Sequence, residues 1–365
     1  GNAQSKRAEL PYRLVSNKMI VEIDVDGTKL PMIFDTGGVM AVMDSVCDQI
    51  GLEQIGNMVI TDMTGRKTTY PQARINKLTI PGSDMAFDSV SVMKITTPSP
   101  IQQFGVAGLV GSDLWTNSIV RIDPKKQVII ITTAEDSVAV DARYKTPFSN
   151  PKGMHPTFPC YVGKQKIDVL FDSGAYGLFA LKESEYRNLY SYNETKLLER
   201  GAGIGSTGVS GTDLQWKERK RIRLSPLKIG AATLEDIVVD ELTTANNNLL
   251  GVWTLNYGEI IIDYSRHLFY FIPYEETVQV DHEFRNIEFI GLGDKLAVKA
   301  VWGDLRRKVK VRDEILEING KPASEYDRTT ILMKGLEVAT KKKKNTLLIK
   351  TRNGNIIVKY EKMRY

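Results

Sequence analysis

Two short segments of the chain carry residues that could do acid–base chemistry as a pair. Residues 34–37 read Phe-Asp-Thr-Gly and residues 171–174 read Phe-Asp-Ser-Gly, so each segment places an aspartate at the end of an apolar run. Two carboxyl groups held a few ångström apart cannot both ionise, and they therefore share one proton. The ionised group, Asp35 or Asp172, can then take a proton from water while the protonated one donates to a carbonyl oxygen. This is general acid–base hydrolysis of an amide.

The residues that follow each aspartate suit such a pair. A hydroxyl and a glycine, Thr36-Gly37 or Ser173-Gly174, allow a tight turn to present the carboxyl group and let a second backbone approach closely. A carboxylate at the end of a buried strand is costly unless its charge is used or neutralised. Taken singly, either aspartate is an ordinary turn residue or strand cap. Taken together, Asp35 and Asp172 are predicted to be catalytic.

The elements that must position the two aspartates also recur along the chain. Matching segments appear twice in the same order, at a nearly constant offset of 137 to 149 positions. The pairs are Lys29–Phe34 with Lys166–Phe171, Leu78–Ile80 with Leu227–Ile229, Phe87–Met93 with Leu234–Asp240, Leu109–Gly111 with Leu249–Gly251, and Gln127–Ile131 with His267–Phe271. Such repetition indicates two copies of one mostly-β unit. We expect them at 10–143 and 150–276, with a proline-rich connector at 144–159.

These motifs resemble those of the retropepsin-like aspartic peptidases, in a form with both lobes fused in one chain. The resemblance rests on the two aspartate loops and on the apolar-apolar-glycine triplets Leu109–Gly111 and Leu249–Gly251. It implies the acid-protease fold, with two β lobes related by a pseudo-twofold axis and a peptide or unfolded protein substrate lying extended between them. It also implies that Thr36 and Ser173 cross-bond the two loops, with Gly37 and Gly174 in support. No cofactor and no metal are expected.

The same resemblance implies hairpin flaps over the cleft. Thr61–Tyr70, with Thr64-Gly65 at its tip, fits a flap of the first lobe, and Gly201–Trp216, with Thr207-Gly208, fits a longer flap of the second. Glycines at these tips allow mobile turns. The segment Gly203–Gly208 also matches the Gly-x-Gly-x-x-Gly pattern of dinucleotide sites, which needs a strand before it and a helix after it.

We predict the opposite order around this glycine pattern. Glu194–Arg200 is expected to be a helix before it, and Thr212–Lys217 a strand after it. Nucleotide binding is therefore not expected.

Residues 284–365 are expected to form a separate small unit whose removal leaves both lobes folded. Its expected elements are strands at Lys295–Val301, Val311–Pro322 with its Asn-Gly turn, Thr346–Thr351 and Asn355–Tyr360, and one long amphipathic helix at Asp327–Thr340. The run Asp313–Gly320 resembles bacterial PDZ domains, which implies capture of a peptide C-terminus as an added strand. Ile290-Gly291-Leu292-Gly293 would be the loop that holds the carboxylate. The alternative is a packing module that supports the second lobe.

The composition of the chain excludes several classes of protein. The chain of 365 residues is 42% hydrophobic and 25% charged, which is ordinary for globular domains and excludes disordered, collagenous and disulfide-scaffold classes. Its net charge of +5 is too diffuse to indicate nucleic-acid binding, and no apolar run is long enough for a membrane helix. Three histidines without a zinc motif argue against zinc, serine and cysteine hydrolases. Cys47 and Cys160 are expected to be separate thiols.

The sequence leaves two functions open. An aspartic endopeptidase is favoured because both catalytic motifs are intact, and a catalytically inactive peptide-binding protein with the same cleft is the alternative. Gly38 and Ala175 provide no hydroxyl after the two triplets, so we expect a pH optimum from mildly acidic to near neutral. The fused lobes with a PDZ-like unit, and an opening Gly1-Asn2-Ala3 without Met, suggest an exported protein of the bacterial periplasm or cell envelope.

Overall fold

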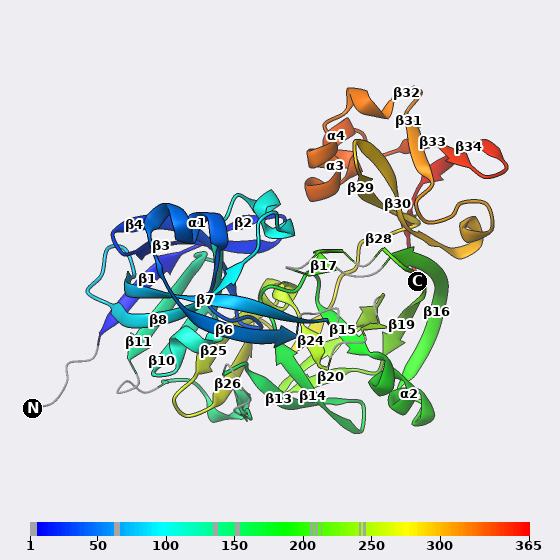
Figure 1. Ribbon diagram of the computed structural model, residues 1–365. Coiled ribbons are helices and arrows are strands. Elements are labelled where there is room, and N and C mark those ends of the chain that lie inside the picture. Colours follow the sequence, from blue (N-terminus) through cyan, green and yellow to red (C-terminus); the bar gives the residue numbers. More distant parts are fainter. Residues whose placement is uncertain are drawn as a thin grey trace, which may run out of the picture.

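The computed structural model of the chain shows two β lobes and a smaller C-terminal unit (Figure 1). It describes residues 6–61, 66–133, 138–149, 154–204, 207–208, 211–212, 214–240, 242–243 and 246–365. The first lobe is drawn in blue and cyan, the second in green and yellow, and the C-terminal unit in orange and red above the second lobe. The predicted mostly-β, two-lobed fold class is confirmed. Within these ranges no helix has the length and apolar character needed to cross a membrane.

An eight-stranded sheet forms most of the first lobe, in the order β2-β3-β4-β9-β5-β8-β7-β6. Its strands are β2 (Arg13–Val15), β3 (Lys18–Val25), β4 (Thr28–Asp35), β5 (Ala41–Met43), β6 (Glu53–Thr61), β7 (Lys67–Thr79), β8 (Ala86–Ile95) and β9 (Gly108–Gly111). Helix α1 (Asp44–Ile50) follows β5. Strands β3 and β4 are joined at Asp26-Gly27, where both residues have positive φ, as a tight two-residue hairpin turn requires.

The second lobe repeats this arrangement with a sheet in the order β23-β15-β24-β14-β13-β20-β21-β27. Its strands are β13 (Thr157–Val162), β14 (Gln165–Phe171), β15 (Phe179–Lys182), β20 (Leu227–Ile229), β21 (Ala232–Glu235), β23 (Leu242–Thr243), β24 (Asn248–Leu250) and β27 (Thr277–Gln279), and helix α2 (Glu183–Ser191) follows β15. In each lobe the strand that leads into the aspartate runs parallel to the strand of the apolar-apolar-glycine triplet, β4 with β9 and β14 with β24.

A six-stranded sheet joins the two lobes, in the order β1-β11-β10-β25-β26-β12. Its strands are β1 (Arg7–Pro11), β10 (Ser118–Asp123), β11 (Val128–Thr133), β12 (Lys145–Pro147), β25 (Gly258–Asp263) and β26 (Leu268–Pro273). The central pair, β10 and β25, comes from equivalent places in the two copies, and one hydrophobic core extends through both lobes. The connector expected at 144–159 therefore supplies a strand, β12, to this shared sheet, while residues 150–153 lie outside the described ranges.

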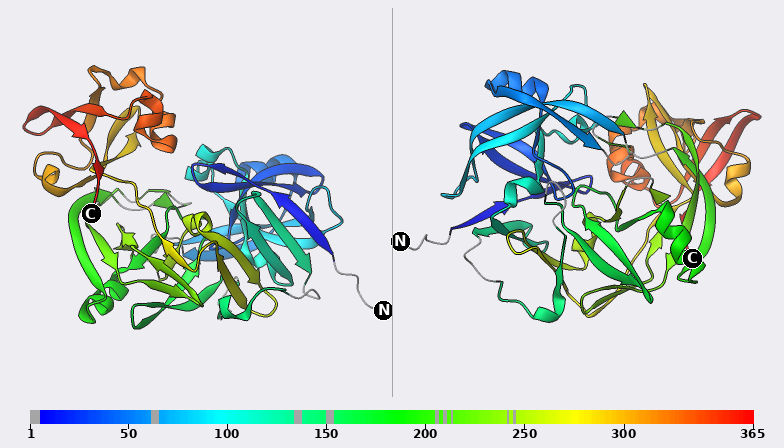
Figure 2. Two further views of the ribbon diagram at one scale, coloured as in Figure 1. Left: turned by 180° about the vertical axis from the view of Figure 1, so that it is seen from behind. Right: turned by 60° about the horizontal axis from the view of Figure 1, so that its bottom comes forward.

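The C-terminal unit continues a sheet that begins in the second lobe. The order is β22-β19-β16-β30-β31-β33-β34, with β29 on the other side of β30. The strands are β16 (Thr195–Ile204), β19 (Trp216–Leu224), β22 (Val238–Val239), β29 (Ile287–Leu292), β30 (Lys295–Trp302), β31 (Glu314–Ile318), β33 (Asn345–Thr351) and β34 (Gly354–Tyr360). Strand β16 pairs with β30 from Gly201 opposite Trp302 to Gly203 opposite Ala300. Figure 2 shows this long green arm reaching the C-terminal unit.

Glycine makes this close pairing of β16 and β30 possible. A Cβ added at Gly201 would lie 2.5 Å from an atom of the Trp302 ring, and one at Gly203 would lie 2.5 Å from Arg219 Cδ. Gly203 thus lies in a paired strand, and the next elements among the described residues are strands rather than the helix that a dinucleotide site needs.

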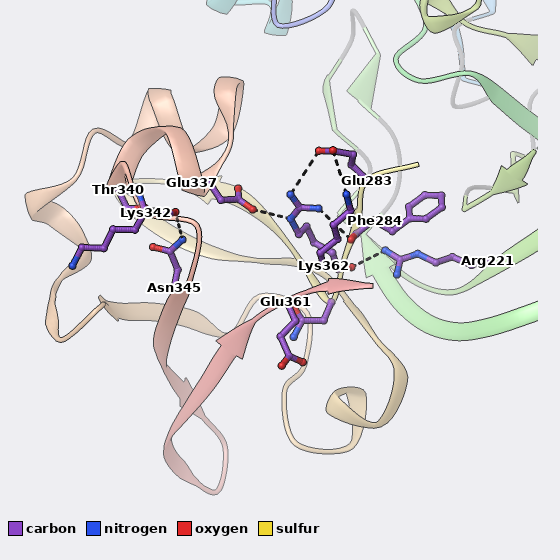
Figure 3. A network of polar contacts seen from close by, with 11 residues as sticks. Arg221, Glu283, Phe284, Glu337, Thr340, Lys342, Asn345, Glu361 and Lys362 are labelled. Carbon is purple, nitrogen blue, oxygen red and sulfur yellow. Dashed lines mark hydrogen bonds and ion pairs between the residues drawn. The ribbon is translucent and has the colours of Figure 1, made fainter. Parts of the chain in front are cut away.

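Arg221 lies in the contact region between the second lobe and the C-terminal unit, which we call the joint. It is only 1% exposed, and its guanidinium lies 3.9 Å from the ring centroid of Trp302 and 4.5 Å from that of Phe284. Its Nη1 donates to the Tyr365 hydroxyl at 2.6 Å and its Nη2 to the Arg285 carbonyl at 2.7 Å. Figure 3 shows this side chain pointing at the Phe284 segment. Because the guanidinium is planar and charged, it can stack on aromatic rings and donate hydrogen bonds at the same time, and it thereby links the second lobe to the C-terminal unit.

A partly buried ion pair lies beside Arg221. Glu288 accepts from Arg219 Nη1 at 3.3 Å and from Trp302 Nε1 at 3.0 Å. Burial alone would raise the pKa of Glu288, but the charges of Arg219 and Lys299 lower it to about 2. The carboxylate therefore stays ionised and paired, which favours one fixed arrangement of the joint.

Two predicted elements differ from the structure. The helix predicted at Glu194–Arg200 is wrong, because these residues lie in or next to strand β16, where pairing with β19 overrides a sequence of good helix formers. The single long helix predicted at Asp327–Thr340 is instead two short ones, α3 (Arg328–Lys334) and α4 (Leu336–Thr340). Gly335, at φ 100°, breaks the helix between them.

The remaining elements are short. They are the strands β17 (Thr207–Gly208), β18 (Gly211–Thr212), β28 (Phe284–Arg285), β32 (Lys321–Pro322) and β35 (Lys362–Met363), and the 3-10 helices η1 (Pro100–Phe104), η2 (Ser112–Trp115), η3 (Ala142–Tyr144), η4 (Val252–Asn256), η5 (Gly303–Arg307) and η6 (Ala323–Glu325).

Candidate active site

The two aspartates predicted to be catalytic meet at the centre of the molecule. Asp35 is the last residue of β4, and Asp172 directly follows β14. A Cβ added at Gly37 would lie 2.4 Å from Asp172 Cγ, and one added at Gly174 would lie 2.6 Å from Asp35 Cγ. Each loop can thus approach the carboxyl group of the other only because its third residue has no side chain. The charge of Asp35 acts on the Asp172 carboxyl group at this close approach.

Hydroxyl groups of Thr36 and Ser173 cross-link the two loops. Thr36 Oγ1 donates to the Phe171 carbonyl at 2.7 Å, and Ser173 Oγ donates to the Phe34 carbonyl at 2.8 Å. In return, each hydroxyl oxygen accepts from the other residue's backbone N–H, at 2.9 and 3.0 Å. Both side chains are fully buried, and each hydroxyl both donates and accepts. This reciprocal network fixes the position of one carboxyl group relative to the other.

The environment of the pair distinguishes its two members. Burial raises the pKa of Asp172 well above its ordinary value, and the charge and hydrogen bond of Asp35 raise it further. The ammonium of Lys18 and the N–H of Gly174, which donates to Asp172 Oδ1 at 2.9 Å, act in the opposite direction. Asp172 is 5% exposed, whereas Asp35 is only partly buried. The shared proton is therefore favoured on Asp172.

Sequence reasoning missed a third hydroxyl beneath the site. Ser112 Oγ donates to the Thr36 carbonyl at 2.6 Å and lies 2.8 Å from the hydroxyl of the buried Tyr264. Next to it, Asp113 Oδ1 accepts from the Met40 N–H at 2.9 Å, and burial raises the pKa of Asp113 to about 6. Ser112 directly follows the triplet that ends at Gly111, and extending the motif by one residue would have found it.

Two basic side chains next to the loops were also missed. Lys18 Nζ donates to the Gly174 carbonyl at 2.5 Å, and His155 Nε2 lies 3.0 Å from the Gly38 carbonyl. Both residues stand 17 positions before the aspartate of their own copy, and both reach the loop of the other copy. This equal spacing is the sequence signal that could have identified Lys18 and His155 as equivalent positions of the two copies.

The flap predicted for the first lobe falls on the hairpin of β6 and β7. These strands pair from Glu53 opposite Arg74 to Thr61 opposite Lys67. The predicted tip residues Thr64 and Gly65 lie outside the described residues.

The flap predicted for the second lobe falls on the hairpin of β16 and β19. Thr207 and Gly208 form strand β17, which pairs with β18. Unlike an independent flap, this hairpin is attached to the C-terminal unit, since β16 pairs with β30 and the Arg312 guanidinium donates to the Leu214 carbonyl.

The predicted carboxylate loop of the C-terminal unit lies on a strand. Ile290, Gly291 and Leu292 are the last residues of β29, and Gly293, at φ 62°, begins the turn into β30. A Cβ added at Gly291 would lie 3.4 Å from Leu332 Cδ1, so helix α3 covers this strand. The four residues therefore form a strand and its turn next to a helix.

Other candidate sites are few in the described part of the chain. No group of three or more His, Cys, Asp or Glu side chains there could hold a metal ion. Cys47 and Cys160 are both free and buried, and burial raises the pKa of the Cys47 thiol to about 11. A hollow of about 390 Å³ lined by residues such as Tyr12, Trp253 and Tyr274 includes neither Asp35 nor Asp172.

Comparison with known proteins gives distant structural likenesses only. No protein-family model matches the sequence, and no curated protein matches it. The structure is similar to that of an aspartic proteinase from Irpex lacteus, with a TM-score of 0.43 and 12% identity over 74% of this chain and 98% of that chain. It is also similar to conglutin gamma, a basic 7S globulin from lupine seeds, with a TM-score of 0.44 and 10% identity over 75% of this chain and 96% of that chain.

Proposed function

We propose that this protein is an aspartic endopeptidase, which hydrolyses peptide bonds with a water molecule activated between Asp35 and Asp172. The observation that carries this proposal is the reciprocal packing of the two loops, in which Gly37 lies against Asp172 and Gly174 against Asp35. A pair of carboxyl groups held in this way, one buried and favoured as the acid, has the two protonation states that amide hydrolysis needs.

The reaction follows from this assignment of the proton. The Asp35 carboxylate takes a proton from water as the water oxygen attacks the carbonyl carbon, and Asp172 donates its proton to the carbonyl oxygen. The tetrahedral diol then collapses, with a proton passing from Asp35 to the leaving amine and one returning from the diol to Asp172. No covalent intermediate forms, and the dyad ends in its starting state. The cross-links of Thr36 and Ser173 keep the two carboxyl groups in register through these steps.

The substrate proposed for this site is an extended peptide or an unfolded protein segment. The hairpin of β6 and β7 and the hairpin of β16 and β19 are the proposed flaps of the two lobes. An extended chain offers its scissile carbonyl to both carboxyl groups at once, which a folded loop or helix does not.

We also propose that the C-terminal unit has a PDZ-like role in capturing peptides. Strand β29 pairs only with β30 among the described strands, so its outer edge can accept a further strand beside α3. The pairing of β30 with β16 favours a second role, as support for the hairpin of the second lobe. The exported, bacterial origin suggested by the sequence remains a prediction.

The function is tested by replacing each aspartate separately. Asp35→Asn and Asp172→Asn should each lower kcat/KM on unfolded casein by about 10⁴-fold, and the double variant should be no worse, because residues that act in one step are not additive. Pepstatin should inhibit the unmodified enzyme. Retention of substantial activity by either single variant would show that the dyad is not the catalytic unit. Peptide binding without cleavage would instead indicate the inactive peptide-binding alternative.

A further inference from the structure

Lys18 places a positive charge next to the dyad. It follows the turn at Ser16-Asn17, where both residues have positive φ, and it opens strand β3. From there its Nζ reaches the loop of the other lobe and donates to the Gly174 carbonyl at 2.5 Å. Since Gly174 packs against the Asp35 carboxyl group, the ammonium lies close to the reacting atoms. Its charge acts on Asp172.

No carboxylate among the described residues forms an ion pair with this ammonium. Its other recorded contact is with the ring of Phe104, whose centroid lies 5.6 Å from Nζ. An ammonium has three N–H donors, and the bond to Gly174 uses one of them. A partly buried cation with donors to spare is suited to a carboxylate brought by a ligand, because a charge-assisted bond is stronger where water is partly excluded.

The equivalent position of the other lobe lacks this fixed charge. His155 stands there and donates from Nε2 to the Gly38 carbonyl. Burial lowers the pKa of His155, although the contact with Gly38 and the charge of Asp172 work in the opposite direction. The imidazole is therefore neutral near pH 7, and only the Lys18 side of the pseudo-symmetric site carries a permanent positive charge.

We propose that Lys18 is a specificity-determining residue that selects substrates with an Asp or Glu side chain next to the scissile bond, an inference that rests on the endopeptidase function proposed above. A peptide whose carbonyl lies between the two aspartates must run past Gly174. A backbone N–H of the peptide can replace Lys18 as the hydrogen-bond donor to the Gly174 carbonyl. Lys18 can then bind the carboxylate of the Asp or Glu side chain of the peptide. The side near His155 has no such preference at neutral pH.

A positional peptide library tests this inference. Each peptide position is fixed in turn as Glu, Gln or Lys, and kcat/KM is measured at neutral pH. At one position beside the cleaved bond, Glu should be preferred over Gln by about tenfold, the effect of one charge-assisted bond. Lys18→Met should reduce that ratio to about one, Lys18→Arg should retain most of it, and Lys18→Glu should favour Lys instead. Lys29→Met, which changes an exposed lysine of the same lobe, should retain the tenfold ratio.

The possible outcomes separate this inference from the proposed function. Cleavage without a Glu preference, or with one that Lys18→Met leaves intact, overturns the role of Lys18 and leaves the endopeptidase standing. If no peptide is cleaved, the binding of labelled Glu and Gln peptides is measured by fluorescence anisotropy. Tighter binding of the Glu peptide that is lost in Lys18→Met then supports the carboxylate subsite and overturns the endopeptidase. Equal binding of the two peptides overturns both.

Discussion

The long hairpins of the two lobes occupy matching places in the repeat but have different partners. Among the described residues, the first-lobe hairpin, β6 and β7, continues only into the first lobe's own sheet, where β7 pairs with β8 and β3. The second-lobe hairpin, β16 and β19, pairs with β30 and so belongs to a sheet that continues through the C-terminal unit. One duplicated element has thus become an independent arm in one lobe and a shared structural element in the other.

This difference changes how the C-terminal unit relates to the cleft. Its attachment to the second lobe includes strand pairing, the stacked Arg221 and the ion pair of Arg219 with Glu288. On the first lobe, Ser16 Oγ donates to the Met333 carbonyl of α3 at 3.1 Å. Because the second-lobe hairpin shares a sheet with the C-terminal unit, the two are expected to move together, whereas the first-lobe hairpin can move alone.

The largest expected effect comes from deleting residues 284–365. The sequence predicts that both lobes fold without them, but the structure shows that the deletion removes the strand paired with Gly201–Gly203 and uncovers Arg221. Amide hydrogen exchange should therefore become fast along β16, with smaller changes in β6 and β7, which serve as the internal control. Unchanged protection of β16 would show that β30 is dispensable for the second-lobe hairpin.

A single substitution at the joint should have a smaller effect. Arg221→Met leaves the Tyr365 hydroxyl and the Arg285 carbonyl without their donor and removes the stacking on Trp302. The expected loss in the free energy of unfolding is about 2–4 kcal/mol, measured by urea denaturation. Arg200→Met on the same hairpin removes an exposed ion pair with Glu218 and should cost about 0.5 kcal/mol or less. Equal costs for the two variants would contradict the role given to Arg221.

The parts of the site that the sequence predicted are those with a local signature. Asp35 and Asp172 were found because each lies in a short motif that the repeat duplicates. The contacts of Lys18 with Gly174 and of His155 with Gly38 join residues more than a hundred positions apart, and no local pattern encodes such pairing. A similar reason explains the wrong helix at Glu194–Arg200, since helix propensity is local while the residues of this segment that lie in β16 pair with β19, 20 to 29 positions further along the chain.

The smallest expected effect concerns the pH dependence of activity, and it again compares the two lobes. In the proposed mechanism Asp172 must carry its proton, so the alkaline limb of activity is expected to follow the loss of that proton. Because burial and the charge of Asp35 raise the pKa of Asp172, this limb should lie above the range of an ordinary carboxyl group. Lys18 works against this shift, and burial lowers the pKa of His155.

A hydroxyl added beside Asp172 should reverse part of this shift. In Ala175→Ser the hydroxyl can donate to the Asp172 carboxylate, which favours its ionised form and moves the alkaline limb of kcat/KM toward acid by just under one pH unit, the effect of a bond of about 1 kcal/mol. The matching change in the first lobe is not equivalent. A Cβ at Gly38 would lie 2.7 Å from Asp35 Oδ2, so Gly38→Ser displaces the carboxylate and should lower kcat/KM at every pH. A pH–rate profile on a peptide without titrating groups distinguishes the two results. If the pH profile of Ala175→Ser is unshifted, the missing hydroxyl does not cause the high pH of the alkaline limb. If Gly38→Ser is fully active, the Asp35 loop can accommodate a side chain at position 38, contrary to its packing.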